Sequence, residues 1–96
     1  MKQSGRRLKV PYDIAGLIRR MHPHLKKKIR ASLQIILSDP ASGKALKDEL
    51  AGLRSFRVSK FRIIYRTSKN PIIEIIAIGP RKKIYEETYR LLKRNR

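Results

Sequence analysis

The chain has 96 residues, of which 25 are Lys or Arg and 7 are Asp or Glu, so its formal net charge is +18. This length fits one modest core and excludes a deep enclosed cofactor cavity, while a hydrophobic fraction of 41% argues against intrinsic disorder. The absence of cysteine excludes disulfides, thiolate metal sites and cysteine nucleophiles, and His22 and His24 are poor candidates for metal ligands. We therefore expect a single domain over residues 1–96 that uses no metal and no cofactor.

The first forty residues are predicted to form a short strand and two helices. Leu8, Val10 and Tyr12 alternate with Arg7, Lys9 and Pro11, which indicates a short strand. An edge position is expected, because the missing backbone donor of the proline does little harm there. Apolar residues then recur at helical spacing from Asp13, which is placed to cap a first helix. The spacing is interrupted at His22 and Pro23, resumes, and ends at Asp39 and Pro40, so the pattern indicates an antiparallel helical hairpin.

The rest of the chain is predicted to be mainly strand. A turn-rich connection, in which residues 44–50 form one or two helical turns, leads into β-branched and aromatic runs. Turn signals at residues 59–60 and 68–71 divide these runs into two hairpins of one antiparallel sheet. Residues 72–78 are almost wholly apolar, as in a central strand. A short helix from Ile84 completes a small α+β sandwich with its helices on one sheet face.

The positive charge is concentrated in two blocks. Residues 1–30 hold ten basic residues and one acidic residue, and residues 53–83 hold nine and one, whereas residues 31–52 hold two and three. A surface this positive attracts polyanions, because Lys and Arg contacts to phosphates release condensed counterions. Nucleic acid is therefore the leading partner, with an acidic protein as a companion.

A membrane is the weakest partner. No apolar run approaches the length that spans a bilayer, and the basic start is not followed by the apolar segment of a signal peptide. The apolar stripes are also better explained by a core. We therefore expect a cytoplasmic protein with no membrane partner.

Basic side chains recur on the predicted sheet and are followed by a tyrosine. Arg57 and Arg62 lie on neighbouring strands, Arg81 comes just after the last strand, and Tyr85 follows it. Arginine stays protonated, offers a bidentate fork to phosphate oxygens and stabilises the charge that grows on them in a transition state. Such a cluster suits a phosphodiester, although the same pattern also fits a solvated outer face of the sheet.

A second basic run lies on the predicted hairpin. Its residues fall largely off the apolar stripe, and they are Lys26, Lys27, Lys28 and Arg30. The run is either a solvated helix face or a face that contacts phosphates.

Short motifs in a characteristic order resemble the RelE/ParE superfamily of type II toxin–antitoxin toxins. They are Ser-Asp-Pro at residues 38–40, Leu-Ala-Gly-Leu at 50–53, the run at 57–65 and the run at 78–85. The resemblance implies two N-terminal helices packed on a small twisted antiparallel sheet with a short C-terminal helix. It also implies a cognate antitoxin, and operator DNA bound only through the complex with that antitoxin.

The resemblance also implies roles for individual residues. Arg62 matches the arginine that contacts the scissile phosphate in RelE-like toxins, Arg81 matches a second phosphate-stabilising arginine, and Tyr85 matches a tyrosine near the reacting nucleotide. Arg57 falls on one of two usually basic positions, and Ser55 departs from the other. Because an arginine cannot give up its proton near neutral pH, proton transfer is left to Tyr85 or to nearby lysines. Those lysines, also candidates for RNA contacts, are Lys60, Lys82 and Lys83.

The superfamily divides by target. RelE-like members are ribosome-dependent endoribonucleases that cut mRNA in the ribosomal A site and inhibit translation, whereas ParE-like members inhibit DNA gyrase without catalysis. The high positive charge favours the RelE-like function, with the basic run on the hairpin as a contact for ribosomal RNA. The alternatives are a ParE-like gyrase inhibitor and a non-catalytic protein that binds RNA or the ribosome.

Overall fold

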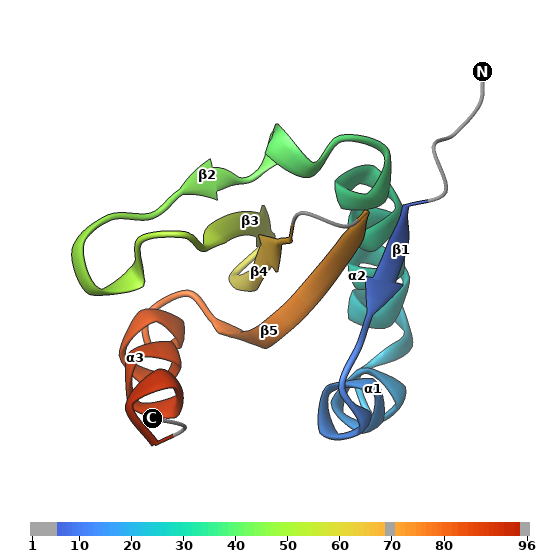
Figure 1. Cartoon of the computed structure of the whole chain (residues 1–96). Coiled ribbons are helices and arrows are strands. Elements are labelled where there is room, and N and C mark those ends of the chain that lie inside the picture. Colours follow the sequence, from blue (N-terminus) through green and yellow to red (C-terminus); the bar gives the residue numbers. More distant parts are fainter. Residues whose placement is uncertain (1–5, 69–70, 95–96) are drawn as a thin grey trace.

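The computed structural model describes residues 6–68 and 71–94 of the chain. Three α-helices, five strands and two short 3₁₀ helices make up this part (Figure 1). In chain order they are β1 (Arg7–Lys9), α1 (Tyr12–Arg19), α2 (Pro23–Ser38), η1 (Pro40–Ser42), β2 (Lys44–Ala45), η2 (Asp48–Leu50), β3 (Arg54–Val58), β4 (Phe61–Thr67), β5 (Ile72–Pro80) and α3 (Ile84–Arg94).

The two N-terminal helices are separated where the sequence predicted. His22 caps α2 by accepting a hydrogen bond from the backbone N–H of His24, and Pro23 fills the first helical position, which needs no backbone donor. The prediction that Asp13 caps α1 was wrong, because Pro11 occupies the capping position and Asp13 lies in the first turn. There its negative charge suits the positive end of the helix.

The five strands form one mixed sheet in the order β1-β5-β4-β3-β2. β5 is central, as predicted, and the turn at Ser59 joins β3 to β4 as an antiparallel hairpin. The expectation of a purely antiparallel sheet was wrong, because β1 pairs with β5 in parallel. The long chain between β1 and β5 permits this parallel pairing. The predicted turn at residues 68–71 lies partly outside the described residues, which omit 69–70.

The connection before β3 is extended where helix was predicted. Residues 44–50 form the two-residue strand β2 and the 3₁₀ turn η2, not one or two continuous helical turns. Asp48 has a φ of 55° in the left-handed region, which a right-handed helix does not contain. This connection therefore covers the sheet edge next to β3.

Side chains of β4 and β5 pack into two separate cores. Ile63 and Tyr65 of β4 pack with buried residues of α1 and α2, whereas Ile64 packs with Leu53 and with Ile84 of α3. Because neighbouring side chains of a strand point to opposite faces, α3 covers the face opposite to α1 and α2. Figure 1 shows the same division, with α3 on one side of β5 and the N-terminal helices on the other. The expectation that all helices share one face was therefore wrong.

Tyr65 anchors the face that α1 and α2 cover. Its side chain is fully buried, as expected for a core position. The hydroxyl donates to the carbonyl of Pro40 at 2.7 Å and accepts from the backbone N–H of Gly43 at 2.9 Å. A Cβ at Gly43 would lie 2.6 Å from that hydroxyl, so only glycine allows this approach. The tyrosine thereby ties the connection after α2 to the centre of the sheet.

No helix within residues 6–68 and 71–94 is long and apolar enough to cross a bilayer.

Candidate nucleic-acid site

A positively charged cleft of about 640 Å³ lies where the β3–β4 turn meets the segment between β5 and α3. We call it the basic cleft, and its lining consists of Arg57, Ser59, Lys60, Pro80, Arg81, Lys82 and Lys83. Five of these seven side chains are basic and none is acidic. A cleft with this lining suits an anion with several oxygen atoms, such as a phosphodiester.

Backbone hydrogen bonds hold the two walls of the basic cleft together. The N–H of Arg81 donates to the carbonyl of Lys60 at 2.8 Å, and the N–H of Lys83 donates to the carbonyl of Pro80 at 3.0 Å. The turn between the strands is tight, because Ser59 adopts a φ of 59°. The exposed side chains of Arg81 and Lys60 are therefore carried on backbone segments that are bonded to each other.

Ser55 is the centre of a polar network beside the cleft. It is 2% exposed, and its hydroxyl accepts a hydrogen bond from a terminal nitrogen of Arg62 at 3.1 Å. The same hydroxyl lies 3.0 Å from the hydroxyl of Tyr85. The guanidinium carbon of Arg62 is 5.9 Å from the centre of the Tyr85 ring. We call these three residues the Ser55 network.

One donor of the Ser55 network has no partner. The Nε of Arg62 is buried and makes no hydrogen bond to the residues described. A buried donor of this kind is uncommon in folded proteins, where such groups are nearly always paired. The network therefore keeps the guanidinium in place through one terminal nitrogen while leaving part of its donor capacity unused.

A close approach at Gly79 positions Tyr85. Gly79 pairs with Arg62 across the sheet, and a Cβ at this glycine would lie 2.9 Å from the Cδ1 of Ile84. Ile84 is buried and begins α3, so its contact with the sheet fixes where the next residue, Tyr85, stands. The Gly-Pro-Arg segment thus positions the tyrosine as well as the arginine.

The four residues predicted to act on the phosphate fall into two adjoining groups. Arg57 and Arg81 line the basic cleft, whereas Arg62 and Tyr85 belong to the Ser55 network. The groups adjoin because Arg57 and Arg62 are cross-strand partners. Arg66, also on β4, belongs to neither group and is paired with Glu74 at 3.0 Å.

No acidic side chain lines the basic cleft. The two salt bridges within the described residues are Arg66–Glu74 and Arg90–Glu86, and neither involves the cleft. The described part of the chain also contains no group of three or more acidic or imidazole side chains that could hold a metal ion. Within the described residues, no basic side chain of the cleft lining is therefore in a salt bridge. The carboxylate of Glu87 lies near the end of β5, with one oxygen 3.6 Å from the place of a Cβ at Gly79.

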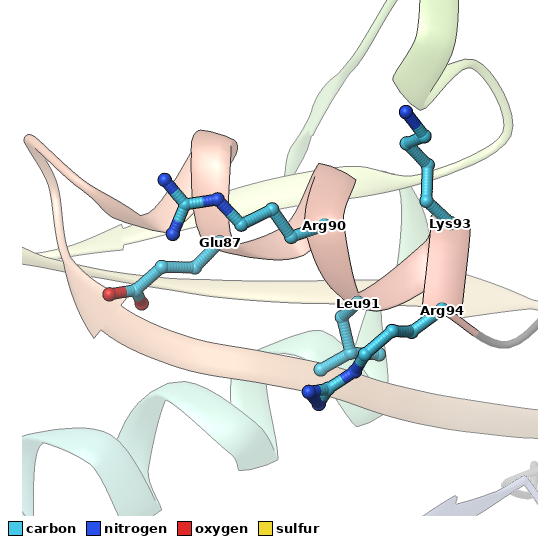
Figure 2. A pocket seen from close by; sticks show the side chains of 5 residues that line it. All are labelled: Glu87, Arg90, Leu91, Lys93 and Arg94. Atoms are coloured by element: carbon cyan, nitrogen blue, oxygen red, sulfur yellow. The ribbon is translucent and has the colours of Figure 1, made fainter.

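A further hollow runs along α3, and its lining differs from that of the cleft. Figure 2 shows Leu91 and Arg94 projecting together from one side of the helix, with Glu87 and Arg90 nearer to its start. All of its lining residues come from α3, and one of them is acidic. This hollow is therefore the side of one helix and brings together no residues from different elements.

The basic run of α2 does not form one face. Lys28 lines a hollow with His22, His24, Leu25 and Ser59, which we call the histidine hollow. Lys27 is exposed and, at 3.6 residues per turn, points almost directly away from the buried Ile29 stripe. Lys26 and Arg30 lie on the flank of that stripe opposite to Lys28. Of the four, Lys28 alone is brought near the sheet site.

Sequence reasoning missed the structural importance of two serines. Ser55 was noted only as a missing basic residue, and Ser59 only as part of a turn. The alternation of side chains along β3 would have indicated the position of Ser55. Ser55 and Arg57 share one face of the strand, while Phe56 and Val58 pack in the core on the other. No sequence signal indicated that Ser59 lines both the basic cleft and the histidine hollow.

Solved structures with the same fold come from RelE toxins. The toxin–antitoxin complex RelBE2 from Mycobacterium tuberculosis has a TM-score of 0.66 at 23% identity, over 77% of this chain and 95% of that one. The archaeal RelE–RelB complex from Pyrococcus horikoshii has a TM-score of 0.65 at 20% identity, over 79% and 94%. The isolated E. coli RelE toxin has a TM-score of 0.65 at 15% identity, over 88% and 96%. At these identities the likeness establishes the fold.

The sequence itself identifies the family. No curated protein matches the chain. Residues 12–85, however, match the family model described as the ParE toxin of the type II toxin–antitoxin system parDE. This segment includes both N-terminal helices, the whole of β2 to β5, and Tyr85. The chain therefore belongs to the ParE toxin family of type II toxin–antitoxin systems, within the RelE/ParE superfamily whose fold it shares.

Proposed function

We propose that this toxin is a metal-independent endoribonuclease that cleaves mRNA on the ribosome and thereby inhibits translation. The observation that carries the proposal is the basic cleft, which lacks acidic residues and adjoins the Ser55 network. Inhibition of gyrase without catalysis needs no such cleft lined by guanidinium and ammonium groups beside a phenol.

The reaction that suits these residues is attack by the neighbouring ribose hydroxyl. The 2′-oxygen bonds to phosphorus, the bond from phosphorus to the 5′-oxygen breaks, and a 2′,3′-cyclic phosphate and a 5′-hydroxyl result. One proton leaves the 2′-hydroxyl and one is delivered to the departing 5′-oxygen. Arg57 and Arg81 face the non-bridging oxygens and stabilise their growing charge, and Arg62 adds its field from the adjoining strand.

Proton transfer falls to groups that can give up a proton. Tyr85 is the candidate within the Ser55 network, and Lys82 and Lys83 are the candidates in the basic cleft. Lys60 lines the same cleft and contributes a phosphate contact. No metal enters this scheme, because each charge that develops has a basic side chain to stabilise it.

Programmed ribosomes provide the test. The toxin is added to ribosomes stalled with a defined A-site codon, and the expected result is cleavage within that codon, leaving 5′-hydroxyl ends. Tyr85→Phe is expected to slow cleavage by about tenfold to a hundredfold, as loss of a proton-transfer group does, while ribosome binding is retained. Tyr89→Phe, one helical turn away and 37% exposed, is the matched control and is expected to cleave normally. Intact mRNA with the wild-type toxin would contradict the proposal.

A second candidate function rests on the family match. The model that matches residues 12–85 describes the ParE toxin, and ParE-like members inhibit DNA gyrase. This function predicts blocked supercoiling with mRNA left intact on the ribosome. A supercoiling assay beside the cleavage assay separates the two, and ribosome binding with neither effect would indicate a non-catalytic RNA-binding protein.

We also propose that a cognate antitoxin binds this chain in the cytoplasm. Two of the solved structures with this fold are complexes of RelE-type toxins with their antitoxins. Operator DNA is then contacted through the complex, with the antitoxin as the reader. Co-expression with a short reading frame found beside the gene, followed by co-purification, is the direct measurement.

A further inference from the structure

The basic cleft continues into a second hollow across a single residue. Ser59, at the tip of the β3–β4 turn, lines the basic cleft on one side and the histidine hollow on the other. The histidine hollow has a volume of about 350 Å³, and α2 supplies its other side chains through His24, Leu25 and Lys28, with the capping residue His22. A ligand held in the cleft can therefore extend over the turn to the start of α2.

The lining of the histidine hollow suits a nucleotide. The rings of His22 and His24 lie edge to face with their centres 6.3 Å apart, and both side chains are exposed. Aromatic and imidazole rings are surfaces on which unpaired RNA bases stack. Lys28, also exposed, adds one positive charge beside them, as a contact to a phosphate requires. The hollow contains no acidic residue.

The same lining does not suit a protein partner. Peptide recognition in a groove depends on several apolar anchors, and Leu25 is the one aliphatic side chain that lines this hollow. The positive charge, the two rings and the continuity with the basic cleft all match a single strand of nucleic acid. Along such a strand, the phosphate would lie in the basic cleft, the backbone would cross the turn at Ser59, and the next base would lie in the histidine hollow.

We propose that the histidine hollow is a binding site for the nucleotide next to the scissile phosphate, with its base stacked on the ring of His24 and its phosphate on Lys28. The inference rests on the proposed nuclease function, because it identifies the basic cleft as the place of the scissile group. It assigns to Lys28 a role that Lys26, Lys27 and Arg30 do not share.

Binding of uncleavable RNA tests this site without requiring catalysis. Fluorescently labelled 2′-O-methyl oligonucleotides of two to eight nucleotides lack the attacking hydroxyl, and their affinity is measured by anisotropy at several salt concentrations. Affinity is expected to rise once the strand is long enough to reach both hollows. Lys28→Ala should then remove about 0.7 from the slope of log affinity against log salt, the value for one phosphate of a single strand. His24→Ala should weaken binding of the longer strands by about fivefold or more.

Lys27→Ala is the matched control, since it removes the same charge one residue earlier on the same helix. Equal losses for Lys27→Ala and Lys28→Ala, or a Lys28→Ala loss that is the same for two nucleotides as for eight, would overturn the site. A labelled oligoglutamate serves as a second anionic ligand. If Lys28→Ala weakened its binding as much as it weakens the binding of RNA, the assignment to RNA would be overturned. Circular dichroism of each variant checks that the fold is kept.

The two proposals can fail separately. Length-dependent binding through Lys28 without cleavage on ribosomes would leave the nucleotide site standing and remove the nuclease function. Cleavage on ribosomes, together with equal affinities of Lys27→Ala and Lys28→Ala for the longer oligonucleotides, would leave the nuclease function standing and remove the nucleotide site.

Discussion

The two faces of the sheet are built from different kinds of side chain, although they share the same strands. The face under α1 and α2 is mainly aliphatic, and its one fully buried tyrosine, Tyr65, has partners for its hydroxyl. The face under α3 carries a smaller apolar cluster beside Ser55, Arg62 and Tyr85, and one buried nitrogen there has no partner. The first face therefore contains most of the buried apolar side chains, whereas the second combines a smaller apolar cluster with the polar groups of the site.

The largest effect on stability is expected from a change in the aliphatic face. Ile63 is fully buried at the centre of β4, so Ile63→Ala removes buried methyl groups and leaves a cavity. We expect the free energy of unfolding to fall by about 2–5 kcal/mol, measured by urea denaturation. The control is Ile35→Ala on α2, where the side chain is 49% exposed and little stability should be lost. Equal losses at the two positions would show that the aliphatic face is not the main source of stability.

The opposite change damages the polar site and leaves the fold intact. Arg81→Ala removes an exposed guanidinium from the basic cleft, while the backbone bond from residue 81 to Lys60 remains. We expect cleavage on programmed ribosomes to slow by about a hundredfold, as for the loss of one group that stabilises transition-state charge. The midpoint of thermal unfolding should hardly change.

The matched control for this arginine is Arg90→Ala. Arg90 lies on α3, pairs with Glu86 at 2.7 Å and is 70% exposed, so its loss removes the same charge away from the cleft. If both variants lost activity equally, overall charge and not the cleft would explain the effect.

A smaller effect on stability is expected at Tyr65, a fully buried polar position of the aliphatic face. Tyr65→Phe removes a hydroxyl that donates to Pro40 and accepts from Gly43. Because both backbone groups then lose a buried partner, we expect a loss of about 1–3 kcal/mol in the free energy of unfolding. Cleavage per folded molecule should be unchanged, since Tyr65 points away from the site. A cleavage defect in folded protein would show that the two faces are coupled.

The elements of the fold could largely be predicted, because hydrophobic spacing reports on burial. The break before Pro23, the central strand β5 and the helix from Ile84 all follow from that spacing. The parallel pairing of β1 could not be predicted, because direction within a sheet depends on where distant strands lie. The position of α3 could not be predicted either, because its apolar pattern does not show which face of the sheet it covers.

The candidate site was predictable in its residue types but not in its arrangement. Arg57, Arg62 and Arg81 stand out as strand-borne arginines, yet the sequence does not show that two of them line a cleft while Arg62 lies beside it. The basic run on α2 was treated as one face, because three consecutive lysines do not show which of them points toward the sheet. Burial of Ile29 separates Lys28 from the rest of that run.

The smallest effect should come from Ser55, which stands where the family pattern usually has a basic residue. Ser55→Ala removes the partner of both Arg62 and Tyr85 but changes no charge and adds no bulk. We expect a loss of about 1 kcal/mol in the free energy of unfolding, the usual net value of such bonds. Cleavage should slow by about fivefold to tenfold, because the phenol and the guanidinium lose the group that holds them.

A double-mutant cycle separates positioning from simple destabilisation. If Ser55 acts through the hydroxyl of Tyr85, Ser55→Ala should slow the Tyr85→Phe variant less than it slows the wild type. Ser55→Thr keeps the hydroxyl and should recover part of the rate in the single variant. Additive losses in the cycle would mean that Ser55 acts on the rate independently of the Tyr85 hydroxyl, through its bond to Arg62. If Ser55→Ala instead cleaved at the wild-type rate per folded molecule, Ser55 would contribute only to stability, and the Ser55 network would be a packing feature of α3.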